Sequence, residues 1–265
     1  MLKTSVQQLL CFGIQAGTGN PALVVQHDHQ DVAQRQQFAR HRKLPACVFI
    51  DRSADGAIAL DYYYPHARSP LCLHATLAAA RLLLSPAQPQ LKVRTAMHGQ
   101  ALTLILRGDQ LYIRLAPQQL TQPAIAPDLP ARLLAMPAIA LRSAPVVASV
   151  GSPKLLLQVA DSKTLQALAP DLAAIRAWGK AQGVNGCYVW CERADGMLEG
   201  RNFNHLEPAM EDQATGVAAG ALSLHLGRPI ALFQGAALGQ PCLIRTELDD
   251  NAVLVGGRAE ILAES

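Results

Sequence analysis

The chain has 265 residues, of which 50% are hydrophobic and 16% are charged, and its formal net charge is +3. This composition supports a large buried core and excludes an extended disordered chain, while the length suits two compact units better than one. The densest basic stretch, residues 40–43, is too short for a nucleic-acid groove, and no run of ~18 apolar residues is present to span a membrane.

Six cysteines stand at positions 11, 47, 72, 187, 191 and 242, and no pair has the CxxC spacing of a zinc site. The histidines form no metal-ligand pattern either. Unpaired thiols are typical of a reducing compartment, and the first residues lack the continuous apolar run of a secretory signal. We therefore expect a cytoplasmic protein that needs no metal or other cofactor and has no nucleic-acid or membrane partner.

Glycines and prolines divide the first half of the chain into short elements. A turn over 17–21 separates two opening strands, and a surface helix is predicted over 31–42. Residues 76–84 contain Thr, Ala, Leu and one Arg, so they predict a helix that is apolar nearly all round and buried on most sides. Further strands are predicted at 46–51, 58–64, 90–95, 101–107 and 110–116.

A Pro- and Ala-rich segment over 117–137 predicts the crossing to the second half, which repeats the plan. Helices are predicted over 171–181, where Pro170 favours a helix start, and over 215–226, which is again rich in small residues and ends at Gly227. The predicted strands are 144–148, 155–160, 187–191, 201–203, 242–245 and 252–261.

Superposing Cys72 on Thr215 aligns the two small-residue helices, with an offset close to half the chain. This offset predicts an internal duplication, that is, two similar lobes that each contain a buried central helix. The N-terminal lobe is expected to cover 1–120, with 250–265 packing back onto it, and the C-terminal lobe is expected to cover 121–249.

Several short motifs follow the order and spacing of the phenazine-biosynthesis isomerase (PhzF-like) family, which the chain resembles over most of its length. They include Gly-Asn-Pro at 19–21, Arg-Asn-Phe at 201–203 and Glu-Asp-Gln-Ala-Thr-Gly at 211–216. The resemblance implies a diaminopimelate-epimerase-like fold and a homodimer. In that α+β fold each lobe is a curved, mostly antiparallel sheet, an open barrel, wrapped round its central helix, with a cleft between the lobes. The other matching segments are 22–25, 44–49, 71–77, 217–218, 235–241 and 255–259.

Both central helices of such a fold begin at the cleft, where their free backbone N–H groups and positive dipole ends suit a carboxylate. The resemblance assigns this binding role to the backbone donors of Leu73, His74, Gly216 and Val217, with Asn20 and Thr215 as further contacts. Asn20 alternatively serves only to form its turn.

Cys72, His74 and Asp212 are the candidate catalytic residues. Cys72 stands where related racemases and epimerases carry a cysteine base. A thiol at a helix start loses its proton more readily than a free thiol, which favours the thiolate. The alternative is that Cys72 is a buried, structural thiol. His74 is either a proton shuttle or a structural pocket residue. Asp212 is either an acid or substrate contact, or the cap of the second helix.

Two departures from the family narrow the chemistry. Ala46 stands at the position of the family's glutamate and Val217 at that of its serine, and a methyl group cannot transfer a proton. The phenazine-precursor isomerisation is therefore not expected.

Thr215 occupies the place of the second racemase cysteine but is a poor base without an activator, which disfavours a two-base reaction. We expect a cofactor-independent isomerase or lyase acting on a small carboxylate; the alternative is a catalytically inactive protein that binds a metabolite or partner.

Overall fold

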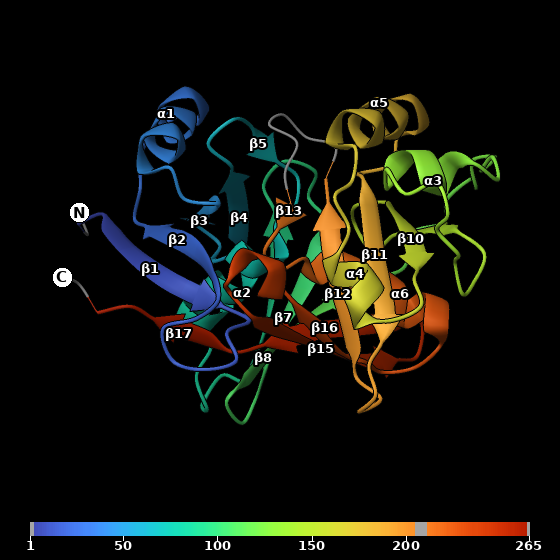
Figure 1. The fold of residues 1–265 in the computed structure, drawn as a ribbon. Coiled ribbons are helices and arrows are strands. Elements are labelled where there is room, and N and C mark those ends of the chain that lie inside the picture. The colour runs from blue at the N-terminus through green and yellow to red at the C-terminus, as the bar shows by residue number, and fades with distance from the viewer. Residues whose placement is uncertain (1–2, 205–210, 264–265) are drawn as a thin grey trace. The chain divides into compact units, whose positions relative to one another are not determined.

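The structure is a computed structural model that describes residues 3–204 and 211–263. Within them the chain has a mixed α/β fold in which strands predominate and helices are few. It divides into two compact units (Figure 1). Unit 1 comprises Met1–Leu115 with Gly256–Ser265, and unit 2 comprises Ala116–Val255. No helix in the described residues is long and apolar enough to cross a membrane.

Unit 1 is a sheet with two helices. Its helices are α1 (Val32–Arg42) and α2 (Leu73–Leu83). Its strands are β1 (Ser5–Cys11), β2 (Asn20–Gln26), β3 (Ala46–Arg52), β4 (Ile58–Tyr63), β5 (Arg68–Ser69), β6 (Gln90–Thr95), β7 (Ala101–Arg107), β8 (Gln110–Leu115) and β17 (Ala259–Ile261).

Unit 2 has a second set of strands and most of the helices. The helices are α3 (Leu129–Leu133), α4 (Ser162–Gln166), α5 (Leu172–Gln182), α6 (Gly216–Leu226) and the 3₁₀ turn η1 (Ala236–Leu238). The strands are β9 (Val146–Ala148), β10 (Lys154–Gln158), β11 (Cys187–Glu192), β12 (Leu198–Phe203), β13 (Glu211–Asp212), β14 (Ala231–Gln234) and β15 (Cys242–Asp249); β16 (Ala252–Gly257) runs over the boundary.

The order of strand pairing in unit 2 repeats that in unit 1. In unit 1 the pairs β1–β2, β3–β4 and β6–β7 are antiparallel, and β2–β3 and β4–β6 are parallel. In unit 2 the pairs β9–β10, β11–β12 and β14–β15 are antiparallel, and β10–β11 and β12–β14 are parallel. Each parallel connection contains a helix, as a crossover between parallel strands requires. The connectivity thus has the form expected of an internal duplication.

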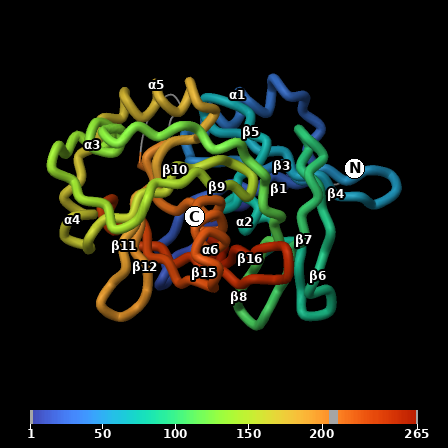
Figure 2. The backbone as a smooth tube through the Cα atoms, turned by 90° about the vertical axis from the view of Figure 1, so that its right-hand side faces the viewer, coloured from blue at the N-terminus to red at the C-terminus, as the bar shows by residue number. Residues whose placement is uncertain are grey.

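The helices α2 and α6 are the most buried helices of their units. The helix α2 packs against β1, β2, β3, β8 and β17, and α6 packs against β9, β10 and β15. A Cβ on Gly220 would lie 2.8 Å from Val255 Cγ2, so the small residue lets α6 approach the strand closely. The other helices of unit 2, α3, α4 and α5, lie on the opposite side of β10–β12 from α6 (Figure 2).

The structure differs from the sequence prediction in several local elements. The helix α2 begins before Thr76, because both the amide and the hydroxyl of Thr76 bond to the carbonyl of Cys72 and close a turn upstream. The segment 117–137, predicted as a simple crossing, contains α3. The predicted strand over 252–261 is divided at Arg258. The strands β5, β13 and β14 were not predicted, since they are too short for a periodic signal.

A buried ion pair ties the short strand before α2 to the sheet of unit 1. Arg68 on β5 donates from Nε to Asp61 Oδ1 on β4 at 2.8 Å. Arg35 of α1 donates to Asp61 Oδ2 at 3.2 Å, and the Tyr63 hydroxyl donates to the same oxygen at 2.9 Å. The Asp61 side chain is only 3% exposed. One carboxylate therefore holds α1, β4 and β5 together.

Unit 2 has the same arrangement with the charges exchanged. Arg201 on β12 donates to both oxygens of Glu211 on β13, at 2.9 and 2.7 Å, and also to the carbonyls of Leu165 and Leu168. The register places this pair where Asp61 and Arg68 stand in unit 1. We call these two ion pairs, Asp61–Arg68 and Arg201–Glu211, the strand clamps.

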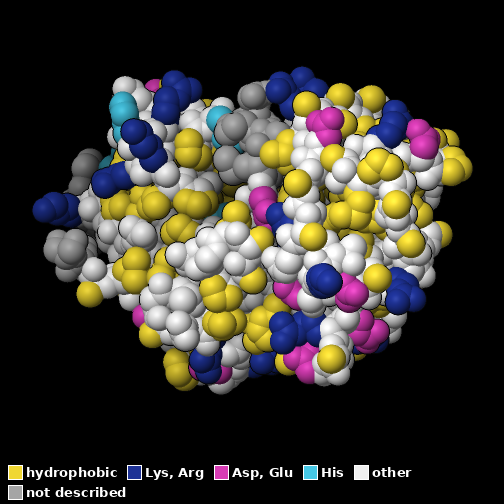
Figure 3. Space-filling view, viewed as in Figure 1, with side chains coloured by type: hydrophobic (Ala, Val, Ile, Leu, Met, Phe, Trp, Pro, Cys, Tyr) yellow, Lys and Arg dark blue, Asp and Glu magenta, His cyan; other side chains and the backbone are white. Residues whose placement is uncertain are grey.

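On the surface, the face shown in Figure 3 carries Lys and Arg side chains in separate groups rather than in one stripe. Asp and Glu side chains lie among them. This distribution matches the modest net charge of +3.

Asp61→Asn should lower the free energy of unfolding by about 3 kcal/mol, because Arg68 loses its carboxylate and Arg35 loses one of its partners in a buried site. Urea denaturation at pH 7 measures the loss. Asp128→Asn is the matched control, since it breaks an exposed ion pair with Arg132 and should cost about 0.5 kcal/mol or less. Equal losses in the two variants would contradict the clamp.

Candidate functional site

The starts of α2 and α6 differ from those of α1 and α5. Asp31 caps α1 and Asp171 caps α5, each accepting a hydrogen bond from an amide of the first turn. The N-cap residues of α2 and α6, Cys72 and Thr215, make no such side-chain bond. At the start of both buried helices, the N-cap side chain therefore accepts no hydrogen bond from the first-turn amides. It also places no negative charge at the positive end of the helix dipole.

In unit 1, Cys72 and His74 meet at the start of α2. Cys72 Sγ lies 3.4 Å from His74 Nδ1, and the two residues are 3% and 6% exposed. The Cys72 carbonyl accepts from the Thr76 amide at 2.9 Å and from its hydroxyl at 2.8 Å, and Tyr62 binds that hydroxyl at 2.7 Å. These bonds fix Cys72 so that its thiol lies against the imidazole. A thiol in this position can pass its proton to the ring and become a thiolate.

Asn20 is connected to the Cys72–His74 contact by Cys11, which pairs with Asn20 and bonds to His74. The strands β1 and β2 pair Cys11 with Asn20, which is fully buried, and Cys11 Sγ donates to the carbonyl of His74 at 3.1 Å. Gly19 has φ +132°, and a Cβ there would lie 2.8 Å from the Cys11 carbonyl oxygen. Glycine is therefore required at the turn that brings Asn20 to β1.

The position of the family's glutamate holds only a methyl group in unit 1. Ala46 is fully buried on β3 and pairs with Ala22 of β2. Cys47 does not replace the carboxylate, because its side chain points to the opposite face, where it packs with Phe49 and Tyr63. Burial raises the pKa of Cys47 to about 12, so it remains a neutral thiol. Cys47 is therefore excluded as a base.

In unit 2, Asp212, Thr215 and Gln234 form a hydrogen-bond chain at the start of α6. Gln234 Oε1 accepts from the Thr215 amide and from the Tyr188 hydroxyl, both at 3.1 Å. This fixes the side-chain amide, so Gln234 Nε2 donates to Thr215 Oγ1 at 3.1 Å. The Thr215 hydroxyl proton is then directed to Asp212 Oδ2, 2.5 Å away. Asp212 is thereby an acceptor at this oxygen.

The first turn of α6 presents backbone donors. The amides of Ala218 and Ala219 bond to the Thr215 carbonyl, each at 3.1 Å. Within residues 3–204 and 211–263, those of Gly216 and Val217 have no acceptor, and the same holds for Leu73 in α2. The sequence analysis assigned these three amides, together with that of His74, to carboxylate binding.

Lys154 is a buried cation of unit 2 that the sequence analysis did not select. It is 2% exposed, and its Nζ donates to the carbonyl of Asn185 at 2.6 Å. Burial lowers the pKa of Lys154 to about 8, while the charge of Asp212 acts in the opposite direction. In the sequence it is a single Lys at the start of an apolar strand, which looks like an ordinary strand end.

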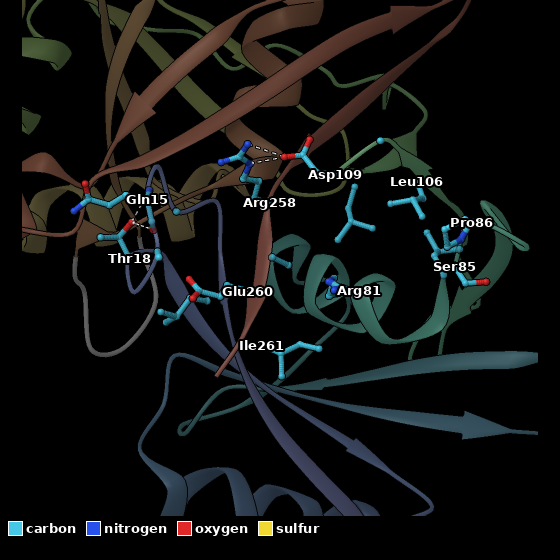
Figure 4. A pocket seen from close by; sticks show the side chains of 17 residues that line it. Gln15, Thr18, Arg81, Ser85, Pro86, Leu106, Asp109, Arg258, Glu260 and Ile261 are labelled. Atoms are coloured by element: carbon cyan, nitrogen blue, oxygen red, sulfur yellow. Dashed lines mark hydrogen bonds and ion pairs between the residues drawn. The ribbon is translucent and has the colours of Figure 1, made fainter. Parts of the chain in front are cut away.

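A cavity of about 720 Å³ opens in unit 1 at the other end of α2 (Figure 4). It is lined by Arg81 and Leu84 and by the ion pair of Arg258 with Asp109, whose closest atoms are 2.7 Å apart. Arg81 and Leu84 lie near the end of α2 opposite to Cys72, while Gly13 and Thr18, between β1 and Asn20, also line the cavity. None of the three candidate catalytic residues lines it.

The structure thus gathers the sequence-predicted residues into one group in each unit. Sequence reasoning missed the partners that orient them. The unit 1 group is Asn20, Cys72, Leu73 and His74, with Cys11 as the missed partner; the unit 2 group is Asp212, Thr215, Gly216 and Val217, with Tyr188 and Gln234 missed. No three or more His, Cys, Asp or Glu side chains in the described ranges are arranged to hold a metal ion.

Comparison with known proteins gives consistent matches over nearly the whole chain. A family model described as phenazine biosynthesis-like protein (PhzC-PhzF) matches residues 11–265. An uncharacterized isomerase of Deinococcus radiodurans is 28% identical over 98% of this chain and 94% of its own. The trans-2,3-dihydro-3-hydroxyanthranilate isomerase of Pseudomonas fluorescens is 27% identical over 88% of this chain and 86% of its own.

A solved structure from Pseudomonas aeruginosa, called a predicted epimerase, is 26% identical. It covers 98% of this chain and 98% of its own, with a TM-score of 0.80.

Lys154→Met removes the buried cation at similar side-chain length. Because the pKa of Lys154 falls from 10.5 to about 8 on folding, only the unfolded chain keeps this proton between those pH values. The stability of the wild type should therefore rise relative to the variant from pH 8 to 10.5, by about 3 kcal/mol, and the difference should be constant below pH 8. Urea unfolding of both proteins at a series of pH values measures this. A difference that does not change with pH would show that Lys154 is not a buried ammonium.

Proposed function

The chain belongs to the phenazine biosynthesis-like family and is an isomerase, and we propose that it moves a proton on a small carboxylate-bearing substrate without a cofactor. The observation that carries this proposal is the contact between Cys72 and His74 at the uncapped start of a buried helix. The imidazole of His74 stands where it can take the proton of the Cys72 thiol, which is the way a cysteine base is activated.

The proposed reaction is a proton shift beside the carboxylate. His74 takes the thiol proton, and the Cys72 thiolate removes a proton from the substrate carbon, so that a C–H bond breaks and its electron pair moves toward the carboxylate or an adjoining double bond. A new C–H bond then forms, at another carbon of the substrate, with a proton from an acid. His74 and Asp212 are the two candidates for that acid.

The amides of Leu73, Gly216 and Val217 are proposed to hold the substrate carboxylate. They are uncompensated donors at helix starts, where an anion is favoured. Asn20 and Thr215 are proposed as further substrate contacts. Since the Thr215 hydroxyl already donates to Asp212, it is a binding group in this proposal rather than a base.

The substrate is proposed to differ from that of the Pseudomonas fluorescens relative. From the family resemblance we expect a glutamate at the position where this chain has Ala46. The side chain of the neighbouring Cys47 points to the opposite face of the sheet. The base therefore has to come from another position, and Cys72 is that position. A different base is expected to act on a different carbon of a different acid.

We also propose two similar lobes, each a sheet wrapped round its own helix, with the substrate in a cleft between them. The repeated order of strand pairing supports this duplication. The lobes are proposed as 1–120 with 250–265, and 121–249. A homodimer in the cytoplasm, with no nucleic-acid or membrane partner, completes the proposal.

Wild-type protein should exchange the α- or γ-proton of at least one acid, in a panel of small amino and cyclic acids, with deuterated water. Cys72→Ala should lower this exchange at least 100-fold, as expected when a general base is removed. The measurement is proton NMR of the substrate. Cys191→Ala is the matched control, because the same atom is removed from another buried cysteine that packs in the apolar cluster of unit 2.

Cys191→Ala should exchange at the wild-type rate. Full exchange by Cys72→Ala would exclude the thiol as the base. No exchange by the wild type with any acid of the panel would contradict the proposed function and favour a protein that only binds a metabolite.

A further inference from the structure

The cavity at the end of α2 is lined by residues of unit 1 alone, and none of the candidate catalytic residues is among them. Its volume of about 720 Å³ lies within the range of small-molecule sites. Four charged side chains line it, namely Arg81, Asp109, Arg258 and Glu260. What the cavity can bind depends on which of these charges already has a partner.

Two of the four charges neutralise each other. Arg258 donates from Nε to Asp109 Oδ2 at 2.9 Å, and its Nη2 lies 2.7 Å from the same oxygen. The pair carries no net charge, so it neither attracts nor repels an ion strongly. The remaining charges are those of Arg81 and Glu260.

Glu260 points away from α2. The register of β1 with β17 pairs Leu9 with Ile261, and Leu9 is fully buried on the side of β1 against which α2 packs. Because side chains alternate along a strand, Ile261 shares that side and Glu260 lies on the other. Glu260 Oε2 accepts from the Gly17 amide at 2.8 Å, and Figure 4 shows this side chain turned toward Thr18. Glu260 therefore does not neutralise a charge on the α2 side.

Arg81 is the cation of the α2 side. Within residues 3–204 and 211–263 it forms no ion pair and donates no hydrogen bond, not even to the last carbonyls of its own helix, which a basic residue in the last turn often binds. Its planar set of N–H donors matches the two oxygens of a carboxylate. The cavity thus presents a guanidinium that is ready for an anion.

The lining around this side of the cavity is largely apolar. Leu84 and Leu111 are 7% and 1% exposed, and Leu106 and Pro86 also contribute. Ile261 is 39% exposed, whereas most large apolar side chains in the described residues are buried. An apolar ligand group would remove this surface from water, which an inorganic anion cannot do.

We propose that the cavity is a second ligand site of the protein, which takes a small organic carboxylate with an aliphatic or aromatic body. The carboxylate lies against the guanidinium of Arg81, and the body covers Leu84 and Ile261. The site is independent of the proposed function, because no candidate catalytic residue lines it.

The ligand class is tested by NMR titration of protein labelled with ¹³C in the isoleucine δ1 methyl groups, with benzoate as the probe. The Ile261 signal, identified by its loss in Ile261→Val, should shift and saturate with benzoate. Neutral benzamide lacks the charge and acetate lacks the ring, so each should bind at least about tenfold more weakly. An Ile261 signal that does not move, or equal affinities for benzoate and either control compound, would overturn the proposal.

The role of the guanidinium is tested with Arg81→Met, which keeps an unbranched side chain and removes the charge. Benzoate affinity at Ile261 should fall at least about tenfold, as expected when a charge-assisted hydrogen bond is lost. Arg40→Met is the matched control, because Arg40 is also an exposed residue in the last turn of a helix, has no partner within the described ranges and does not line the cavity. Wild-type affinity in Arg81→Met, or an equal loss in both variants, would contradict the assignment.

The amide signals of Leu73 and Gly216 separate this site from the proposed carboxylate site at the helix starts. In Arg81→Met these amides should respond to benzoate as in the wild type, while the response of Ile261 is lost. Equal loss at all three residues would overturn a separate site. If the amides do not respond even in the wild type, carboxylate binding at the helix starts fails, while the Ile261 titration still decides the present proposal.

Discussion

The strand clamps are the constraint on which both candidate groups depend. Each joins a strand of the sheet to the two-residue strand just before a buried helix, and so fixes where that helix begins. The acid is on the longer strand in unit 1, as Asp61, and on the shorter one in unit 2, as Glu211. The sign of each charge is exchanged but the pair is retained, as expected where burying one charge without its partner would be costly.

The two helix starts that the clamps position have different chemistry. Unit 1 presents Cys72 against His74, a thiol beside a group that can take its proton. Unit 2 presents Asp212 and Thr215 in a chain whose direction is set by a backbone amide through Gln234. In the proposed reaction the unit 1 group moves a proton and the unit 2 group holds a charge, so the two units have different roles.

The sequence predicted the parts of this arrangement that depend on composition. The two small-residue helices were found because Ala, Gly and Leu make them apolar all round, and the superposition of Cys72 on Thr215 matches their two N-caps. Lys154 was missed because the face that it occupies depends on the register of β10 with β11, which the sequence does not reveal. The strand clamps were missed because β5 and β13 have two residues each, too few for a periodic pattern.

The most direct measurement is an amide NMR titration of ¹⁵N-labelled protein with propionate, and with neutral propionamide as the control. The central claim is that the uncapped starts of α2 and α6 bind a carboxylate. The amide signals of Leu73, Gly216 and Val217 should then shift and saturate with propionate and stay in place with propionamide. Signals that do not move, or that move equally with both compounds, would contradict it.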